Sequence, residues 1–319
     1  DFSNVQICNY EEGNCGTCPK CMEVMRELQY ANSPTYPHWN QTIYSITDAY
    51  VNNEDGVTAK EKLLEWLPLH ELRLYTNNRC QKSCDFCFYG YSENAPREEL
   101  RTEDWLEVLK KAQKLYVKSI MFSGKEPMID DSIFLIHDWA KALGFQTHIN
   151  TNGLTLKKYE KELKGNPPDR LMVSLNYEDT YSLIPLLGSL NEYMLVQPYL
   201  LVLDSNVGQI FRAISECIKH GITSFYFRFV YPPQFSHERE RHILNQLKSY
   251  PATFQVPVDY SQIEDWEHYD QYLKGQIPRD GNIEFCFVHN FCLAYYNTLT
   301  ILHNGEIVGC AKHTYGSWD

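Results

Sequence analysis

The sequence predicts an α/β fold in which six βα units form a partial barrel, with small cysteine-rich extensions at both ends. Two observations predict it. Between residues 71 and 230, short apolar runs alternate with amphipathic stretches, the pattern of a parallel sheet covered by helices. Ten of the 11 cysteines form three groups, two of them outside this alternating region. The 319 residues suffice for a barrel of about 200 residues plus attachments.

The predicted strands are runs rich in aliphatic, β-branched and aromatic residues, bounded by turn residues. They are residues 71–76, 117–122, 146–150, 171–175, 194–203 and 225–230. In barrel-like α/β proteins, the ends of the strands and the loops after them carry the chemistry. Polar or glycine-bearing segments follow several of these strands, so we expect the functional residues there.

Three helices have clear boundaries in the sequence. The first begins at Thr102, an N-cap residue type followed by two acidic residues. The second opens at Asp130 and Asp131 and ends near residue 143, before Gly144. The third is capped by one of residues 204–206 and extends to His220. From this pattern we expect three regions: an N-terminal metal-binding segment and connector (1–64), the barrel (65–235) and a C-terminal region (236–319).

Cys80, Cys84 and Cys87 form the pattern Cys-x3-Cys-x2-Cys directly after the first predicted strand. A [4Fe-4S] cluster held by protein alone needs four thiolates, so three at close spacing leave one iron open to a small molecule. The alternative is a structural zinc loop with a remote fourth ligand.

This pattern, with an aromatic Phe86 before the third cysteine, resembles the signature of the radical S-adenosylmethionine (radical SAM) superfamily. The resemblance implies a partial TIM-like barrel and an open-site [4Fe-4S] cluster on Cys80, Cys84 and Cys87, whose free iron chelates S-adenosylmethionine. It also places Phe86 and Tyr89 beside the cofactor.

Residues 123–127, Ser-Gly-Lys-Glu-Pro, are similar to the Gly-Gly-Glu-Pro segment of that family, which binds the amino group of the cofactor. The resemblance assigns this contact to Glu126, with Ser123 and Gly124 beside it. Ser123 and Lys125 depart from the family pattern. Without the resemblance, the segment is an ordinary turn between a strand and a helix.

The resemblance also places four residues of later strands near the cofactor. Asn152 lies in a Thr-Asn-Gly segment after the third strand, which is equally natural as a turn. Ser174 and Asn176 occupy alternate positions at the end of the fourth strand. Arg228 lies within the sixth strand, and it is assigned to the cofactor carboxylate or, alternatively, to a structural ion pair.

Two further cysteine groups predict more metal. Cys292-x12-Gly305-x4-Cys310 resembles the SPASM and twitch extensions that hold auxiliary iron-sulfur clusters, with Cys286 as a third ligand. Residues 298–302 and 306–308 are expected to form a hairpin around Asn304-Gly305. The alternative is three scattered buried cysteines.

The N-terminal group of four cysteines suits zinc or another iron-sulfur cluster. It consists of Cys8, Cys15, Cys18 and Cys21.

Composition narrows the partners and the compartment. A net charge of −12 disfavours nucleic acid, because nucleic-acid binders concentrate positive charge. The sequence has many cysteines but shows no apolar signal segment and no apolar stretch long enough to cross a bilayer. We therefore expect a cytoplasmic protein with no membrane association. The remaining cysteine, Cys217, lies on the apolar side of a predicted helix and is expected in the core.

The resemblance implies an enzyme whose reduced cluster splits S-adenosylmethionine, giving a 5′-deoxyadenosyl radical that abstracts a hydrogen atom. The expected substrate is a ribosomally made peptide or a protein side chain, with an oxidative crosslink, thioether or epimerisation as the product. An electron donor such as flavodoxin or ferredoxin is implied. The alternatives are a dehydrogenase or rearrangement enzyme for a small metabolite, and a non-catalytic metal-binding scaffold.

Overall fold

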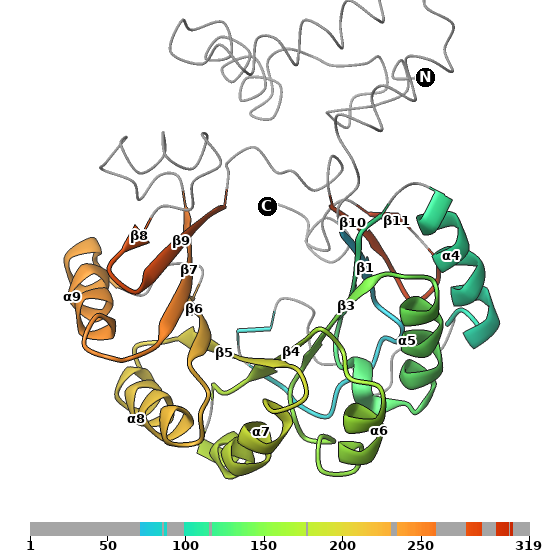
Figure 1. Cartoon of the computed structure of the whole chain (residues 1–319). Coiled ribbons are helices and arrows are strands. Elements are labelled where there is room, and N and C mark those ends of the chain that lie inside the picture. Colours follow the sequence, from blue (N-terminus) through green and yellow to red (C-terminus); the bar gives the residue numbers. More distant parts are fainter. Residues whose placement is uncertain are drawn as a thin grey trace, which may run out of the picture.

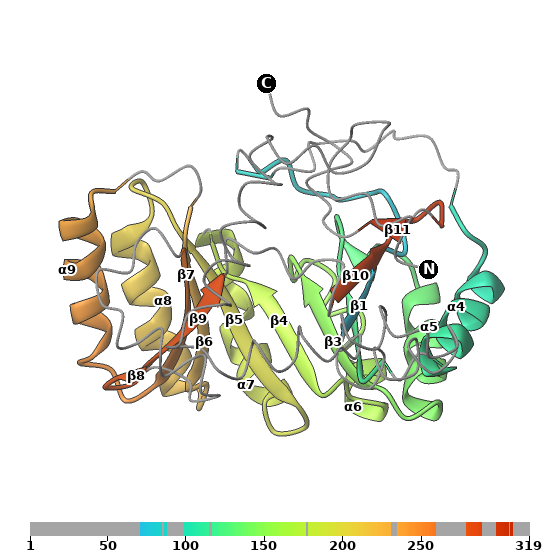
Figure 2. The same cartoon turned by 90° about the horizontal axis from the view of Figure 1, so that it is seen from above.

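The computed structural model describes residues 71–84, 86–87, 99–114, 117–176, 178–230, 235–259, 279–288, 298–305 and 307–308. Over these residues the chain forms one curved sheet with helices along its outer side (Figure 1). Figure 2 looks into the open side of the curve, with β4 and β5 at its centre. The predicted fold class is confirmed, because the sheet is mostly parallel and does not close within the described residues.

The sheet has 11 strands in the order β11-β10-β1-β2-β3-β4-β5-β6-β7-β9-β8. All neighbours from β10 to β9 are parallel, and β11 and β8 are antiparallel strands at the two edges. The strands are β1 Glu71–Leu74, β2 Ser119–Phe122, β3 Gln146–Thr151, β4 Arg170–Ser174, β5 Leu195–Val202, β6 Ser224–Phe229, β7 Thr253–Asp259, β8 Arg279–Asp280, β9 Ile283–Val288, β10 Thr298–Ile301 and β11 Ile307–Val308.

Helices connect the parallel strands and cover the outer face of the sheet (Figure 1). They are α4 Thr102–Lys114, η2 Pro127–Ile129, α5 Ser132–Ala142, α6 Glu160–Gly165, η3 Glu178–Leu183, α7 Ile184–Leu190, α8 Val207–Lys219 and α9 His237–Leu247. Among the described residues, no helix combines the length and the apolar character needed to cross a membrane.

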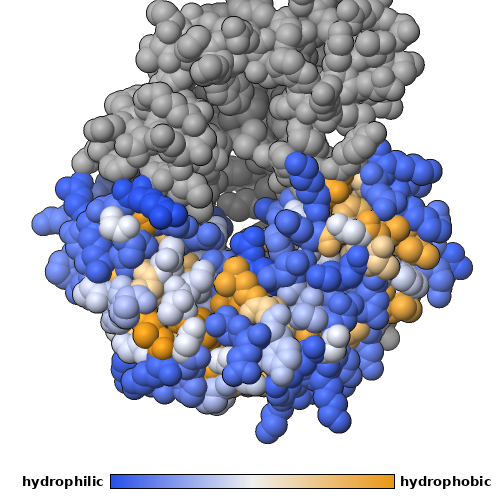
Figure 3. Space-filling model, viewed as in Figure 1, coloured by the Kyte–Doolittle hydropathy of each residue, from blue (hydrophilic) through white to orange (hydrophobic). Residues whose placement is uncertain are grey.

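The two faces of the sheet differ in chemistry because side chains alternate along each strand. Residues such as Phe122, Phe225 and Phe227 are fully buried in the core that also contains the apolar sides of the helices. At the alternate positions, Ser174 and Arg228 are only partly buried. Figure 3 shows a largely hydrophilic described surface in this view, with separate hydrophobic areas. The partly buried positions of the strands are therefore the ones available to a ligand.

The six predicted strands correspond to β1 to β6 with small differences at their ends. The predicted helix starting at Thr102 is α4, although its capping contact differs from the expected one. The backbone N–H of Arg101 donates to Asp104 Oδ2 over 3.0 Å, and the backbone N–H of Asp104 donates to the Arg101 carbonyl. This reciprocal pair makes Arg101 the N-cap and Thr102 the first helical residue.

The C-terminal strands belong to the same sheet as the barrel strands. The predicted hairpin is present as β10 and β11, with Thr300 opposite Val308 and Gly305 at a φ of 86°. β10 pairs with β1 at one edge, while β7 and β9 extend the sheet beyond β6. The sequence predicts the β10–β11 hairpin and six βα units, but it does not predict β7 and β9. The division of the chain into 1–64, 65–235 and 236–319 stays a prediction.

Candidate active site

The cysteine loop follows β1 at the carboxyl ends of the parallel strands, and Figure 2 shows this segment, in cyan, at the upper ends of the strands. Cys80, Cys84 and Cys87 are each partly exposed. The backbone N–H of Cys87 donates to the carbonyl of Cys84 over 2.9 Å, which turns the chain between these two cysteines. The loop thus presents three free thiols at the edge of the sheet where the sequence predicts the functional residues.

Hydrogen-bond donors surround the sulfur atom of Cys80. The backbone N–H of Lys82 donates to Cys80 Sγ over 3.4 Å, and the side-chain amide of Asn152 donates to it over 3.6 Å. Asn152 Nδ2 also donates to Gln81 Oε1 over 3.2 Å. Asn152 follows β3, so these contacts join the cysteine loop to the predicted cofactor segment 151–153.

Asn77 and Arg79, which precede Cys80, hold the beginning of the loop. Asn77 is buried and donates from Nδ2 to the carbonyl of Glu126 over 2.8 Å, while its Oδ1 accepts from the backbone N–H of Arg79. The Arg79 guanidinium forms ion pairs with Glu99, at 3.4 Å, and with Asp130. These contacts fix the beginning of the loop to the turns after β2 and before α4.

Glu126 is fully buried and accepts three hydrogen bonds from its own chain. Oε1 accepts from the backbone N–H of Met128 over 3.0 Å and from Thr151 Oγ1 over 2.7 Å. Oε2 accepts from the backbone N–H of Asn152 over 2.6 Å. Burial raises the pKa of Glu126 to about 7, although the three hydrogen bonds act in the opposite direction. The described carboxylate thus links the loops after β2 and β3, and its predicted contact with a cofactor ammonium stays a prediction.

Gly124 and Lys125 occupy the stretch between β2 and Glu126. Gly124 has a φ of 111°, and a Cβ there would lie 3.0 Å from the ring of Tyr75, so only glycine fits the close approach. Lys125 is partly buried. Burial lowers the pKa of Lys125, whereas the nearby thiols of Cys87 and Cys80 act to raise it. Lys125, which departs from the family pattern, is therefore close enough to the cysteine loop for its charge to interact with the thiols.

The ends of β4, β5 and β6 supply the other predicted residues. Asn176 is buried, and its Oδ1 accepts from the backbone N–H of Leu201 over 2.7 Å. Asn206 donates to the carbonyls of both Asn176 and Leu201, which joins the end of β4 to the end of β5. Arg228 lies opposite Leu201 in the register of β5 and β6. Within the part of the chain that the structure describes, the side chain of Arg228 makes no hydrogen bond or ion pair, so the predicted structural ion pair is not observed there.

Sequence reasoning missed several residues of this region. Asn77 and Arg79 were not singled out, although an Asn-Asn pair between a strand and a cysteine loop is a turn signal that draws attention to Asn77. Tyr199 and Tyr226 stack with ring centroids 5.2 Å apart and face each other in register on β5 and β6. Their pairing has no local signal, because it depends on which strands are neighbours.

The structure describes some of the other predicted residues fully, some only by their backbone, and some not at all. Cys286 belongs to β9, where its backbone lies opposite Pro257, and its side chain is not described. Phe86 is described and partly buried. Cys217 is buried in the core, as predicted. The remaining predicted site residues lie outside the described residues; they are Cys8, Cys15, Cys18, Cys21, Tyr89, Cys292 and Cys310.

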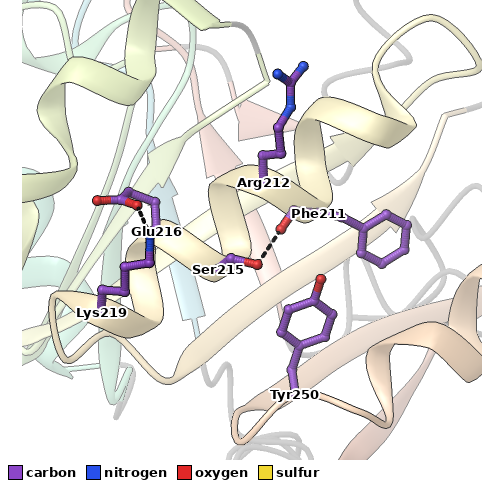
Figure 4. A pocket seen from close by; sticks show the side chains of 6 residues that line it. All are labelled: Phe211, Arg212, Ser215, Glu216, Lys219 and Tyr250. Carbon is purple, nitrogen blue, oxygen red and sulfur yellow. Dashed lines mark hydrogen bonds and ion pairs between the residues drawn. The ribbon is translucent and has the colours of Figure 1, made fainter.

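A surface hollow lies on a different part of the molecule, between α8 and the turn before β7 (Figure 4). It is lined by Phe211, Arg212, Ser215, Glu216, Lys219 and Tyr250. Phe211 and Tyr250 have nearly parallel rings, and Glu216 forms an ion pair with Lys219. None of the predicted functional residues lines this hollow, so we do not assign the active site to it.

The residues present fit a cluster with one open iron. Three free thiols on one loop match the required donor set, and N–H donors point at the sulfur of Cys80, as is typical of iron-sulfur sites. Among the described residues, no group of three or more His, Cys, Asp or Glu side chains has the close convergence of a single metal-ion site. In a cluster the three thiolates bind three different irons, so such convergence around one ion is not needed.

Comparison with known proteins agrees with this chemistry. The sequence model described as "Radical SAM superfamily" matches residues 74–245, which is more than half of the chain. Two curated relatives are each named "Probable GTP 3',8-cyclase". The protein of Methanothermobacter marburgensis is 34% identical over 110 residues, covering 34% of this chain and 36% of the relative. The protein of Saccharolobus solfataricus is 33% identical over 110 residues, covering 34% and 35%. The alignments thus span about a third of these relatives.

Solved structures share the fold over more of the chain. Streptococcus suis SuiB bound to precursor peptide SuiA has a TM-score of 0.62 at 20% identity, covering 82% of this chain and 64% of that chain. SuiB bound to S-adenosylmethionine has a TM-score of 0.56 at 18% identity, covering 85% and 70%. The protein anSMEcpe with bound AdoMet has a TM-score of 0.53 at 14% identity, covering 78% and 76%. At these identities the likeness concerns the fold.

Proposed function

The chain belongs to the radical SAM superfamily, and from this premise we propose that it modifies a ribosomally made peptide or a protein side chain. The superfamily implies a [4Fe-4S] cluster and bound S-adenosylmethionine; when bound and reduced, the cluster supplies the electron that cleaves the cofactor to methionine and a 5′-deoxyadenosyl radical. The observation that carries the proposal is the loop of three free thiols within the part of the chain that the superfamily model matches.

In the proposed site, Cys80, Cys84 and Cys87 are the cluster ligands. Phe86 and Tyr89 lie beside the cofactor, and Ser123, Gly124 and Glu126 provide the segment that receives its amino group. The backbone at Gly124 packs closely against the ring of Tyr75 because no side chain intervenes.

The ends of the later strands complete the proposed cofactor site. Asn152 is adjacent to the cysteine loop, and Ser174 and Asn176 offer small polar groups at the end of β4. Arg228 suits the cofactor carboxylate, since a guanidinium binds carboxylates strongly and this one has no partner in the described residues. The protein's part is to orient the cofactor and to exclude water from the reacting groups.

The proposed substrate is supported by the neighbours in structure. SuiB has been solved with its precursor peptide, and anSMEcpe has been solved with bound AdoMet and the Cp18Cys peptide. A peptide substrate is compatible with an oxidative crosslink, a thioether or an epimerised residue as the product. A cytoplasmic location and a flavodoxin or ferredoxin as electron donor belong to the same proposal.

Auxiliary metal sites extend this proposal to both ends of the chain. Cys286, Cys292 and Cys310 are proposed ligands of a SPASM- or twitch-like auxiliary cluster. The N-terminal group is proposed to hold zinc or another iron-sulfur cluster. Its members are Cys8, Cys15, Cys18 and Cys21.

A second candidate function is the rearrangement or dehydrogenation of a small metabolite. It is favoured by the similarity to probable GTP 3',8-cyclases, which is higher in identity than the likeness to the peptide-binding neighbours but covers only a third of the chain. A third reading, a metal-binding scaffold that no longer makes radicals, rests on the departures at Ser123 and Lys125.

The test is anaerobic reconstitution with iron and sulfide, followed by quantitation of bound iron and a dithionite-driven assay for 5′-deoxyadenosine. Wild type is compared with the Cys80→Ala, Cys84→Ala, Cys87→Ala triple variant. Cys217→Ala is the matched control, because it removes a thiol that is buried in the core away from the loop. We expect deoxyadenosine from wild type and the control, and none from the triple variant.

Zinc alone, or no deoxyadenosine from intact protein, would support the scaffold instead. Substrate class is then tested by adding either peptides encoded by neighbouring genes or nucleotides, with mass spectrometry of the products. A mass change in a peptide supports the first candidate, and turnover of GTP or a related nucleotide supports the second.

A further inference from the structure

Two N–H donors of the described residues point at the sulfur atom of Cys80. Its Sγ accepts from the backbone N–H of Lys82 and from the side-chain amide of Asn152. Asn152 is held for this contact from both sides. Its backbone N–H donates to the buried carboxylate of Glu126, and its Oδ1 accepts from the backbone N–H of Leu154 over 2.9 Å. An amide fixed in this way is a preorganised donor to sulfur.

Lys125 adds a positive charge to the same region. The backbone on either side of it is anchored, with Gly124 against the ring of Tyr75 and the Glu126 carbonyl accepting from Asn77, three residues before Cys80. The side chain is partly buried, and burial lowers the pKa of Lys125 while the nearby Cys87 and Cys80 act in the opposite direction. Lys125 lies between Gly124 and Glu126, so the two anchored neighbours fix the place of its backbone.

We propose that Asn152 and Lys125 are positioning residues that make the cluster on Cys80, Cys84 and Cys87 easier to reduce. This inference rests on the proposed function. One electron from a low-potential donor of the flavodoxin or ferredoxin class increases the negative charge of the site by one. A nearby cation and an N–H donor to sulfur stabilise the more negative state more than the oxidised one, because both interactions grow with the charge on the thiolates. The residues thus act on the reduction potential through the cysteines.

The experiment is an EPR-monitored redox titration of the full reconstituted chain without S-adenosylmethionine, following the signal that is absent from the Cys80→Ala, Cys84→Ala, Cys87→Ala triple variant. The variants are Asn152→Ser, which keeps a turn-forming oxygen but lacks the reach to Cys80, and Lys125→Met, which keeps length and removes charge. Lys125→Arg is the conservative variant. Lys118→Met is the matched control, because Lys118 is exposed just before β2, at the opposite end of that strand.

At the potential where the wild-type cluster is half reduced, we expect the ratio of reduced to oxidised cluster to fall about threefold in each single variant. In the double variant we expect about tenfold, which corresponds to a potential lower by 59 mV for a one-electron couple. Lys125→Arg and Lys118→Met should titrate like wild type. Variants that assemble the cluster and keep the wild-type ratio would overturn the inference, whereas wild type that assembles no cluster would overturn the proposed function itself.

Discussion

The site has two halves whose polar side chains are used in different ways. In the β1–β3 half, formed by the loops after β1, β2 and β3, polar groups bind one another: Glu126 accepts three hydrogen bonds and Asn77 makes two. In the β4–β6 half, formed by the ends of β4, β5 and β6, the side chain of Arg228 makes no polar contact within the described residues. Buried groups that satisfy each other fix backbone conformation, whereas a charged group with no partner among the described residues retains its capacity for a ligand there.

Residues of one site therefore need not have one kind of role. The β1–β3 half sets the shape of the cysteine loop, so substitutions there should change the stability of the protein. The β4–β6 half supplies Arg228, whose loss should change binding and leave stability nearly unaltered. Asn176 is an exception in the second half, because its Oδ1 is used by the backbone of Leu201.

The largest effect is expected for Glu126→Ala. The substitution leaves the donors of Met128, Thr151 and Asn152 without their acceptor inside the protein and opens a cavity. At pH 5.5 we expect the free energy of unfolding to fall by about 4 kcal/mol. Urea denaturation followed by circular dichroism measures it. A loss below about 1 kcal/mol would remove the distinction between the two halves.

The pH dependence of stability tests the burial of Glu126 directly. Its pKa is raised to about 7 in the folded protein from 4.5, so between these values the unfolded state releases a proton that the folded state keeps. The contribution of Glu126 to the free energy of unfolding is therefore fully present below pH 4.5 and falls as the pH rises towards 7. Above the folded-state pKa this contribution is absent. The total change is about 3 kcal/mol.

Glu126→Gln has no such proton, so the difference in unfolding free energy between wild type and this variant isolates the effect. We expect it to change by about 3 kcal/mol between pH 4.5 and pH 8, with wild type becoming the weaker of the two as the pH rises. A difference that stays constant across this range would show that the carboxyl group is not buried as described.

Gly124→Ala measures how tightly the turn after β2 packs against β1. Both Gly124 and Gly144 have positive φ, but only at Gly124 does an added Cβ meet another group, the ring of Tyr75. We expect Gly124→Ala to cost about 2 kcal/mol and Gly144→Ala about 1 kcal/mol. Thermal or urea unfolding of the two variants checks the order, and equal losses would mean that the Tyr75 contact is easily relieved.

The smallest effect on stability is expected for Arg228→Met, because the guanidinium has no described partner to lose. The free energy of unfolding should stay within about 0.5 kcal/mol of wild type. Binding of S-adenosylmethionine to the reconstituted protein should weaken about tenfold, through the lost charge-assisted contact. Equilibrium dialysis measures the affinity, with Arg212→Met on the outer hollow as the control. Unchanged affinity, or a large loss of stability, would assign Arg228 to structure instead.

Much of the fold could be predicted from the sequence, because apolar runs and turn residues are local signals. β1 to β6, α4, α5, α8 and the β10–β11 hairpin were all expected within a few residues. The strands β7 and β9 were missed. β7 contains Pro257 between Val256 and Val258, and a proline within a run argues against a central strand, while β9 contains the charged Glu284. Their place in the sheet is decided by pairing with each other and with β6.

For the site, the sequence predicts the residue types: three thiols at the spacing of an open cluster, Gly124 two residues before Glu126 after β2, and polar residues after later strands. The tertiary structure decided which of these groups touch. Asn152 reaches Cys80 from 72 residues away, and Asn77 reaches the Glu126 carbonyl from 49 away. Periodicity reports on neighbours two to four residues apart, whereas these contacts depend on the register of parallel strands. That register buries Glu126 and brings Asn152 to the sulfur of Cys80.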